Sequence, residues 1–414
     1  MTPASVVILV GAAASPADET LRAATAALAA AGAPPAARVI VEDDEAALER
    51  ALGGDAPLTV IVSGPGGSAG DIVRRVLARV TGARLVLSER MLAALAGAAR
   101  RRDRPLDRRA ERQALLPQGA TLLPLGDAGP GWALEAGPRA FVVVPPGAPV
   151  ERLAPELAAL ATPRLAGRAA VAVRTLRVAG VSLADVEDRL AEWLGPNAAG
   201  TDVDASTLPA DGEVWVRLRA RGPTPTAAGE AVAAAEAKVR PALGEDCYGA
   251  DDESLERVVG RLLLDRGLTV ALAESCTGGL VGHRLTAVPG SSAYFERGAM
   301  VYSNRAKEEM LGVPADVLRA HGAVSAPCAE AMARGIRVAS GAACGLAITG
   351  IAGPDGGTPT KPVGTVFVGL AVRGDVTSRR FRFSGDRASV KWQSSQMALD
   401  MLRRRLLAEP PRGR

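Results

Sequence analysis

The chain has 414 residues, which is long enough for two or three domains with large buried cores. Lys and Arg number 49 against 45 Asp and Glu, giving a net charge of +4, so the balance does not point to direct contact with nucleic acid. Aromatic residues make up only 3% and histidines number two, which argues against base-stacking platforms and excludes a histidine-rich metal centre.

Cysteine usage and the first apolar run indicate the cellular compartment in which the protein works. The four cysteines form no CxxC pair and favour a reducing cytoplasm over a disulfide framework. The run Val6–Val10 follows no basic stretch and is too short to span a bilayer. We therefore expect a buried strand there, and a cytoplasmic protein without a membrane partner.

The first segment alternates short apolar runs with Ala-rich helical stretches. The expected strands are Val6–Val10, Ala37–Val41, Leu58–Val62 and Phe141–Val144, and the expected helices include Asp18–Ala31 and Asp43–Leu52. This alternation predicts a parallel, doubly wound α/β sheet. Gly64–Gly67 follows the third strand, where such sheets usually meet ligands, and a break is expected at Pro163. Acidic residues and a proline interrupt the Arg run over 99–112, which favours a solvated helix and loop over a nucleic-acid arm.

Two further segments follow. The middle one predicts a small α+β unit without a catalytic constellation, with strands Ala170–Leu176 and Glu213–Arg219 and helices Ala184–Leu194 and Ala227–Val239. The third alternates again, with strands Thr269–Ala273, Ala299–Tyr302, Gly345–Thr349 and Gly364–Leu370 and helices Gly278–Thr286, Asn304–Leu311, Pro327–Ser340 and Ser389–Leu407. Its most informative polar residues lie where the strands end.

The first polar cluster, Glu274–Gly279, joins a strand to a helix. A hydroxyl such as that of Ser275 is exposed at this turn, and the helix start offers free N–H groups to an oxyanion or phosphate. A helix N-cap with glycines for the turn explains the same residues. In the second cluster, Tyr302–Lys307, a desolvated Lys307 can act as a general base toward a serine, although an exposed helical lysine fits the pattern too.

Two more clusters suggest ligand contacts. Thr349–Gly357 has four glycines that let backbone amides approach a ligand, but it matches neither common nucleotide fingerprint and also fits a flexible loop. Arg387 can bind a phosphate or carboxylate, or pair with Asp386 or Asp400 at the surface.

Taken together, these clusters resemble a known family. The third segment resembles the C-terminal domain of the competence/damage-inducible CinA family, which also occurs alone as the nicotinamide mononucleotide deamidase PncC. The matching stretches are Ala273–Gly279, Gly290–Gly298, Tyr302–Asn304 with Lys307, His321–Ser325, Thr349–Gly357, Lys361–Val366 and Ser384–Arg387. They cover most of the segment in the family's order.

The resemblance implies an amidohydrolase that converts nicotinamide mononucleotide (NMN) and water to nicotinic acid mononucleotide and ammonia. The family's nucleophile falls on Ser275 and the lysine of its Ser-Lys dyad on Lys307, and its other activity-bearing positions fall on Tyr302, Thr349 and Arg387. No metal or cofactor is implied for this step. His283 and His321 are then expected to be structural or packing residues, and Cys276 a small buried one.

Substrate contacts follow from the same reasoning. We expect helix-start amides near Thr277 and Gly278 to hold the oxyanion. The glycine loop, with Gly350 and Gly353, and Arg387 would hold the ribose and the 5′-phosphate.

The rest of the chain resembles full-length CinA. The expected domains are a molybdopterin-binding-like domain over 1–165, a small α+β middle domain over 166–248 and the amidohydrolase domain over 249–414. The family's first domain is credited with metal-dependent ADP-ribose pyrophosphatase activity. Here Gly11–Ala14 and Gly64–Asp71 depart from its acidic motifs, and Asp71 alone is a weak metal candidate. We therefore predict that this site is lost or impaired, that no divalent metal is used there, and that the domain serves dimerisation or docking.

Two classes of function remain at this stage. One is NMN deamidation in pyridine nucleotide salvage by a homodimer. The other is a non-enzymatic scaffold that binds a recombinase in competence or DNA damage. The sequence favours the enzyme, because all five activity-bearing positions have the expected residue type.

Overall fold

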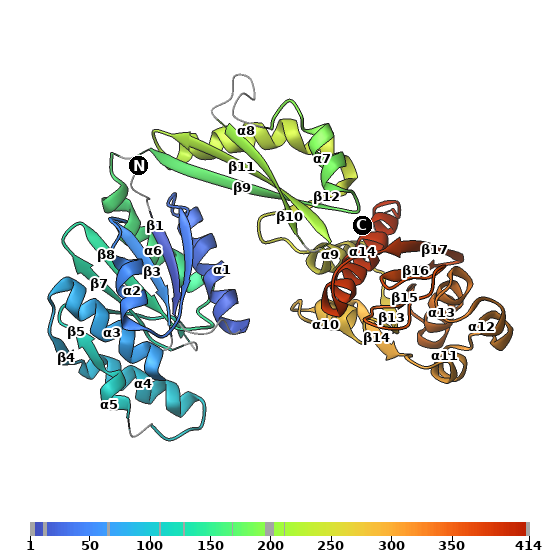
Figure 1. Cartoon of the computed structure of the whole chain (residues 1–414), viewed down its shortest axis with the longest axis horizontal. Coiled ribbons are helices and arrows are strands. Elements are labelled where there is room, and N and C mark those ends of the chain that lie inside the picture. The colour runs from blue at the N-terminus through green and yellow to red at the C-terminus, as the bar shows by residue number, and fades with distance from the viewer. Residues whose placement is uncertain are drawn as a thin grey trace. The chain divides into compact units, whose positions relative to one another are not determined.

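The computed structural model of the chain describes residues 5–10, 15–63, 67–106, 109–126, 129–167, 169–194, 203–210 and 212–410 (Figure 1). The chain forms two compact units, residues 1–173 with 219–234 and residues 174–218 with 235–414. Within the described residues, no helix combines the length and the apolar character that crossing a membrane requires.

The first segment is a six-stranded sheet with helices on both faces (Figure 1). The strand order is β2-β1-β3-β8-β7-β6; the first four strands are parallel, and β7 and β6 each run antiparallel to the preceding neighbour. The strands are β1 (Ser5–Val10), β2 (Ala37–Val41), β3 (Leu58–Val62), β6 (Thr121–Leu123), β7 (Gly131–Ala136) and β8 (Arg139–Val144), and a separate pair is β4 (Leu85–Leu87) with β5 (Leu115–Pro117). The helices are α1 (Ser15–Ala30), α2 (Glu45–Leu52), α3 (Gly67–Thr81), α4 (Glu89–Arg101), α5 (Ala110–Gln113) and α6 (Val150–Leu165). The doubly wound α/β prediction is confirmed for four parallel strands, and the antiparallel pair extends it.

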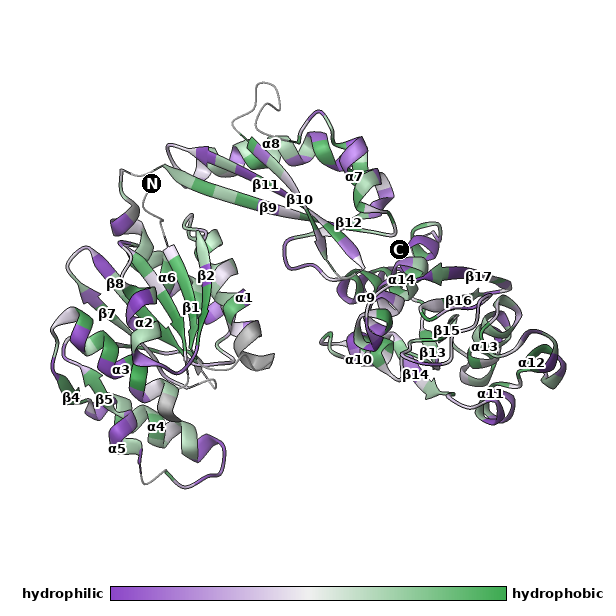
Figure 2. Cartoon of the chain, in the orientation of Figure 1, coloured by the Kyte–Doolittle hydropathy of each residue, from purple (hydrophilic) through white to green (hydrophobic). Residues whose placement is uncertain are grey.

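Both faces of this sheet are buried. Val60 and Val62 of β3 lie in the apolar cluster with α1 and α6, whereas Ile61 lies in the cluster with α2, α3 and α4. Side chains alternate between the faces of a strand, so burial on both faces explains the continuous apolar runs (Figure 2). The helix α6 continues through Pro163, near which the sequence predicted a break, and ends two residues later at Leu165.

The middle segment forms a four-stranded sheet of order β10-β11-β9-β12. Its elements are β9 (Ala170–Ala179), α7 (Leu183–Arg189), β10 (Val203–Ala210), β11 (Glu213–Gly222), α8 (Pro225–Leu243) and β12 (Cys247–Ala250). The α+β prediction holds, but β10 and β12 were not expected from the sequence. The first helix ends at Arg189, five residues before its expected end at Leu194.

The third segment is a five-stranded sheet of order β14-β13-β15-β16-β17 between two helical layers (Figure 1). Its strands are β13 (Val270–Glu274), β14 (Phe295–Met300), β15 (Cys344–Gly350), β16 (Thr365–Val372) and β17 (Asp375–Arg382). Its helices are α9 (Leu255–Arg266), α10 (Leu280–Thr286), α11 (Asn304–Leu311), α12 (Ala315–His321), α13 (Ala326–Ser340) and α14 (Arg387–Leu407). Strands β14, β13 and β15 are parallel, so their carboxyl ends meet at one edge. The strand expected over Ala299–Tyr302 lies earlier, and it ends at Met300.

Candidate active site

Ser275 and Lys307 meet at this edge of the sheet. Ser275 directly follows β13, where its N–H donates to the Ile348 carbonyl of β15. Lys307 lies in the first turn of α11, which begins after the N-cap Ser303. The Lys307 Nζ lies 3.2 Å from the Ser275 Oγ, although 32 residues separate them in the sequence.

The surroundings of Lys307 favour its neutral form. The side chain is 1% exposed, and its Nζ also contacts the carbonyl oxygens of Val301 at 2.7 Å and Tyr302 at 3.2 Å. Desolvation by burial lowers the pKa of Lys307 below its ordinary value. A neutral amine can donate its two N–H bonds to these carbonyls and direct its lone pair at the Ser275 hydroxyl. The exposed-lysine alternative is therefore wrong, because the side chain is buried.

The start of α10 is less open than the sequence suggested. The buried Glu274 carboxylate accepts hydrogen bonds from the N–H groups of Gly279 at 3.0 Å, Val281 at 3.2 Å and Gly282 at 2.8 Å. These donors are the unsatisfied groups that a helix start would otherwise offer to an anion. The expectation of free helix-start amides is wrong for these three groups, because an internal carboxylate already caps the helix.

The turn between Ser275 and α10 retains other donors. The Gly278 N–H donates to the Ser275 carbonyl at 3.1 Å, in a turn that Gly278 enters with φ +60°. Thr277 is fully buried, and its hydroxyl has no hydrogen-bond partner among the described residues. A buried hydroxyl without a partner carries a desolvation cost.

Arg387 connects the glycine loop to Tyr302. Its guanidinium donates to the Gly353 carbonyl at 2.7 Å and to the Tyr302 hydroxyl at 3.0 Å. Arg387 pairs with neither Asp386 nor Asp400 among the described contacts, because Asp386 caps α14 through the Ser389 N–H and Asp400 binds two other arginines. The Arg387 guanidinium therefore stays at the site. It has five N–H donors, more than its contacts with Gly353 and Tyr302 use.

Thr349 and Gly350 serve the backbone around the site. The Thr349 side chain is buried, and its hydroxyl donates to the Ala323 carbonyl at 2.8 Å. A Cβ added at Gly350 would lie 2.6 Å from the Val366 Cγ2, so this glycine permits close packing of β15 on β16. Both residues stabilise the backbone near the dyad. The Thr349 hydroxyl already donates its hydrogen bond to a protein carbonyl.

An open pocket of about 1100 Å³ has Arg387 in its lining, whereas Ser275 and Lys307 do not line it. Its lining comes from the starts of two helices that pack together, α10 and α14, and comprises Leu280, Gly385, Asp386, Arg387, Ala388, Ser389, Lys391 and Trp392. The sequence analysis did not single out Lys391. The residue lies four positions after Arg387, so helical periodicity places both cations on one face and could have indicated it. Its Nζ lies 3.7 Å from the position of a Cβ added at Gly278.

Other candidates near the dyad have simpler roles. Cys276 is 5% exposed, as expected for a small buried residue, and burial raises the pKa of its thiol to about 12. His283 and His321 are both exposed, so the packing role expected for them is wrong. The His321 carbonyl accepts a hydrogen bond from the Lys361 ammonium at 2.8 Å.

Asp71 is the residue of the first segment that the sequence offered as a metal candidate. Gly11–Ala14 and Gly64–Gly66 lie outside the described residues. Asp71 forms an ion pair with the buried Arg74 one turn along α3. The described residues contain no group of three or more His, Cys, Asp and Glu side chains placed to hold a metal ion.

The sequence matches three family models in order. Residues 7–166 match the "Probable molybdopterin binding domain", residues 173–249 the "Damage-inducible protein CinA KH domain" and residues 252–406 the "CinA C-terminal domain". A CinA-like protein of Geobacter sulfurreducens is 42% identical over 369 residues, covering 87% of this chain and 88% of that relative. The chain belongs to the CinA family.

Another relative and a solved structure are also similar to this chain. A CinA-like protein of Syntrophotalea carbinolica is 41% identical over 360 residues, covering 86% of this chain and 85% of the relative. The crystal structure of a CinA superfamily protein from Klebsiella pneumoniae is 36% identical, covers 38% of this chain and 100% of its own, and has a TM-score of 0.37. The resemblance seen in the sequence is confirmed, and the chain combines a molybdopterin-binding-like domain, a CinA KH domain and a CinA C-terminal domain.

Proposed function

We propose that this CinA protein is an amidohydrolase that converts NMN and water to nicotinic acid mononucleotide and ammonia. The observation that supports the proposal best is the contact of 3.2 Å between the Lys307 Nζ and the Ser275 Oγ. A desolvated lysine beside a serine at a strand-to-helix turn is a base-and-nucleophile pair suited to acyl transfer.

The chemistry follows from the dyad. Neutral Lys307 takes the Ser275 hydroxyl proton while the Oγ attacks the carboxamide carbon of the nicotinamide ring. The resulting tetrahedral oxyanion collapses, the C–N bond breaks, and the Lys307 ammonium returns the proton to the leaving ammonia. Lys307 then takes a proton from water, whose oxygen attacks the acyl-enzyme ester, and the proton passes to the departing Ser275 oxygen.

The turn after the nucleophile would hold the oxyanion. The Gly278 N–H already donates to the Ser275 carbonyl and the Leu280 N–H to the Thr277 carbonyl. Glu274 accepts from the N–H groups of Gly279, Val281 and Gly282. The remaining candidates are the backbone N–H of Thr277 and its buried hydroxyl, which lacks a partner among the described residues. Donors aimed at developing charge in a site shielded from water contribute strongly to catalysis.

Arg387 and Lys391 would bind the 5′-phosphate of the substrate. Both line the pocket at the start of α14, and Lys391 forms no ion pair with any described residue. Two cations at a helix start suit a dianionic phosphate. Tyr302 is 64% exposed and bound to Arg387, and it would contact the ribose or the pyridine ring.

The first segment would act as a dimerisation or docking scaffold, with its pyrophosphatase site lost. The ion pair of Asp71 with Arg74 supports this, because the carboxylate's charge is already balanced by protein. ADP-ribose cleavage by the full chain in the presence of Mg²⁺ or Mn²⁺ would disprove it. The control for this assay is the chain in EDTA.

Ammonia release from NMN tests the main proposal. Ser275→Ala and Lys307→Met should each lower the turnover number by about 10³-fold or more, as removal of a nucleophile or its base does elsewhere. Cys276→Ala, which changes a buried neighbour of the nucleophile, is the matched control and should keep most of the activity. If the folded wild-type chain releases no ammonia, the proposal fails and the recombinase-binding scaffold becomes the leading candidate.

A further inference from the structure

One side chain of α14 connects the middle segment to the walls of the pocket. The Gln396 side chain is 2% exposed and lies between two charged groups. Its Oε1 accepts from the Arg284 guanidinium of α10, and its Nε2 donates to the Glu213 carboxylate of β11 at 3.1 Å. The amide orientation is fixed, because only the oxygen can face a cation donor and only the nitrogen can face a carboxylate.

Arg284 in turn contacts both helices that line the pocket. It belongs to α10, whose first residue, Leu280, lines the pocket. Its guanidinium stacks on the Trp392 ring of α14 at 4.4 Å, and Trp392 is a lining residue as well. It also donates to the Ser395 hydroxyl at 2.7 Å and to the Glu256 carboxylate of α9 at 2.6 Å. Arg284 therefore joins α10 to α14 next to the pocket lining.

Glu213 is held firmly on the side of the middle segment. It pairs with Arg177 of β9 at 2.9 Å and accepts hydrogen bonds from the Tyr248 hydroxyl and the Trp215 indole. The neighbouring turn packs closely on α14, since a Cβ at Gly212 would lie 3.1 Å from the Gln396 Cγ and 3.3 Å from the Gln393 Cα. A carboxylate fixed by three partners is a rigid point from which to position Gln396.

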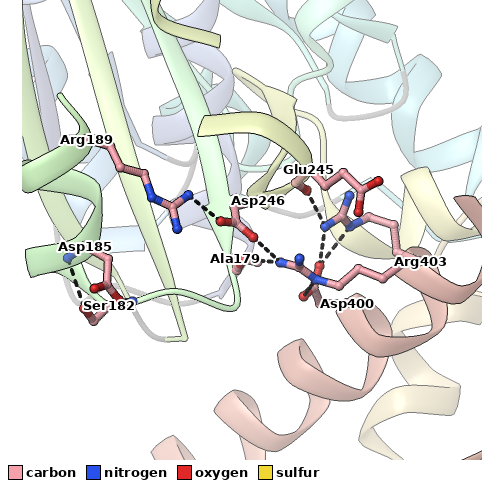
Figure 3. Close-up of polar contacts among 9 residues, drawn as sticks. Ala179, Ser182, Asp185, Arg189, Glu245, Asp246, Asp400 and Arg403 are labelled. Carbon is pink, nitrogen blue, oxygen red and sulfur yellow. Dashed lines mark hydrogen bonds and ion pairs between the residues drawn. The ribbon is translucent and has the colours of Figure 1, made fainter. Parts of the chain in front are cut away.

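A second set of ion pairs fixes the same helix further along. Asp400 and Arg403 are buried and pair at 2.6 Å, and Arg403 also donates to the Glu245 carbonyl at 2.7 Å (Figure 3). Arg404 bonds Asp400 and Asp246, and Asp246 also pairs with Arg189 of α7. The middle segment therefore contacts α14 from Gln393 to Arg404, beginning next to the pocket lining.

We propose that the middle segment positions the substrate pocket of the third segment, with Glu213, Gln396 and Arg284 as positioning residues that set the spacing of α10 and α14. The inference rests on the proposed deamidase function for its kinetic consequence only. Ser275 follows β13 and Lys307 lies in α11, and none of the three positioning residues belongs to either element. Disturbing the connection should therefore weaken substrate binding and leave the chemical step intact.

A charge exchange in the full chain tests this connection. Gln396→Glu keeps an acceptor for Arg284 but brings two carboxylates together at Glu213, which drives the middle segment from α14. Combining it with Glu213→Gln restores a donor opposite the new carboxylate. Gln118→Glu adds the same charge at an exposed position of the first segment and serves as the control.

Two readouts separate this inference from the proposed function. We expect Gln396→Glu to raise the KM for NMN about 10-fold with the turnover number within about twofold, and the double variant to recover most of the KM, as for coupled neighbours. Hydrogen exchange of amides in 280–286 and 385–392 should quicken in the single variant and return toward wild type in the double variant. This second readout needs no turnover and holds even if NMN is not the substrate. Unchanged exchange in both helices, or a fall in turnover number without a rise in KM, would overturn the inference.

Discussion

The Lys307 Nζ touches the Ser275 Oγ and two backbone carbonyls, and no described carboxylate forms an ion pair with it. A buried ammonium normally has a carboxylate partner, because desolvation of an isolated charge is costly. The absence of that partner among the described residues agrees with the lowered pKa of Lys307. The arrangement favours a base over a structural cation.

This pKa sets the pH dependence that we expect for ammonia release. Only the neutral amine can accept the serine proton, so kcat/KM should rise as the pH increases through the pKa of Lys307 in the free enzyme. Burial lowers that pKa from its ordinary value of 10.5, and the midpoint of the rise should therefore lie below pH 10.5. The measurement is a pH profile of kcat/KM for NMN.

A Lys307→Arg variant is the matched control for the profile. Its guanidinium stays protonated across the accessible range and cannot serve as the base. The variant should be nearly inactive at every pH. An active Lys307→Arg enzyme with the same pH profile would show that another group takes the proton.

Cys276 offers a test of which neighbour is the nucleophile. The thiol is 5% exposed, and its pKa of about 12 keeps it protonated and unreactive near neutral pH. Cys276→Ala should therefore retain activity within about threefold, at a stability cost of about 1 kcal/mol for the lost core volume. Resistance of the wild-type enzyme to iodoacetamide provides a second check. Loss of turnover in Cys276→Ala with an unchanged melting temperature would contradict the assignment of Ser275.

The sequence predicted the fully buried strand β3 and missed strands β10 and β17, whose side chains are largely exposed. Strand β3 has five buried positions in a row, and the sequence predicted both of its end residues correctly. Strands β10 and β17 lie at sheet edges with mostly exposed side chains, so no apolar run indicates them. Edge strands owe their conformation to pairing with a neighbour, and that pairing depends on the tertiary fold.

The sequence predicted which residues of the site follow strand ends. It did not predict which side chains contact one another. Ser275 and Lys307 were singled out near strand-to-helix junctions, and the family resemblance then paired them as nucleophile and base. That Glu274 caps α10 could not be inferred, because a carboxylate at a strand end has many alternative partners. The same holds for Gln396, whose two partners lie 112 and 183 residues away in the sequence.

Glu274 supports a prediction of stability. Its carboxylate accepts three N–H bonds at the start of α10, and an amide oxygen in its place would leave an NH2 group facing one of these donors. Glu274→Gln should lower the free energy of unfolding of this region by about 2 kcal/mol, from the lost charge-assisted bonds and the lost helix-dipole interaction. Hydrogen exchange of the α10 amides measures the effect locally.

The control for this prediction is another helix cap. Asp44 is the exposed N-cap of α2, and its side chain accepts from the Ala47 N–H. Asn serves almost as well as Asp at an N-cap, so Asp44→Asn should change stability by less than about 0.5 kcal/mol. Equal changes in the free energy of unfolding from the two substitutions would mean that Glu274 stabilises α10 no more than an ordinary N-cap does.

We predict that Lys391 contacts the 5′-phosphate of NMN. Its ammonium has no ion-pair partner among the described residues and lies beside Gly278 at the pocket. Removal of a charge-assisted contact costs about 1.5–3 kcal/mol, so Lys391→Gln should raise the KM for NMN about 10-fold or more, whereas Lys391→Arg should stay within a few-fold of wild type.

Nicotinamide riboside lacks the phosphate and should be a poor substrate whose kcat/KM is the same for wild type and Lys391→Gln. Higher salt should weaken NMN binding to wild type more than to the variant, because screening acts on the charge that the variant lacks. An equal loss of kcat/KM for both substrates in Lys391→Gln would instead assign the lysine to the shape of the pocket and leave Arg387 to bind the phosphate.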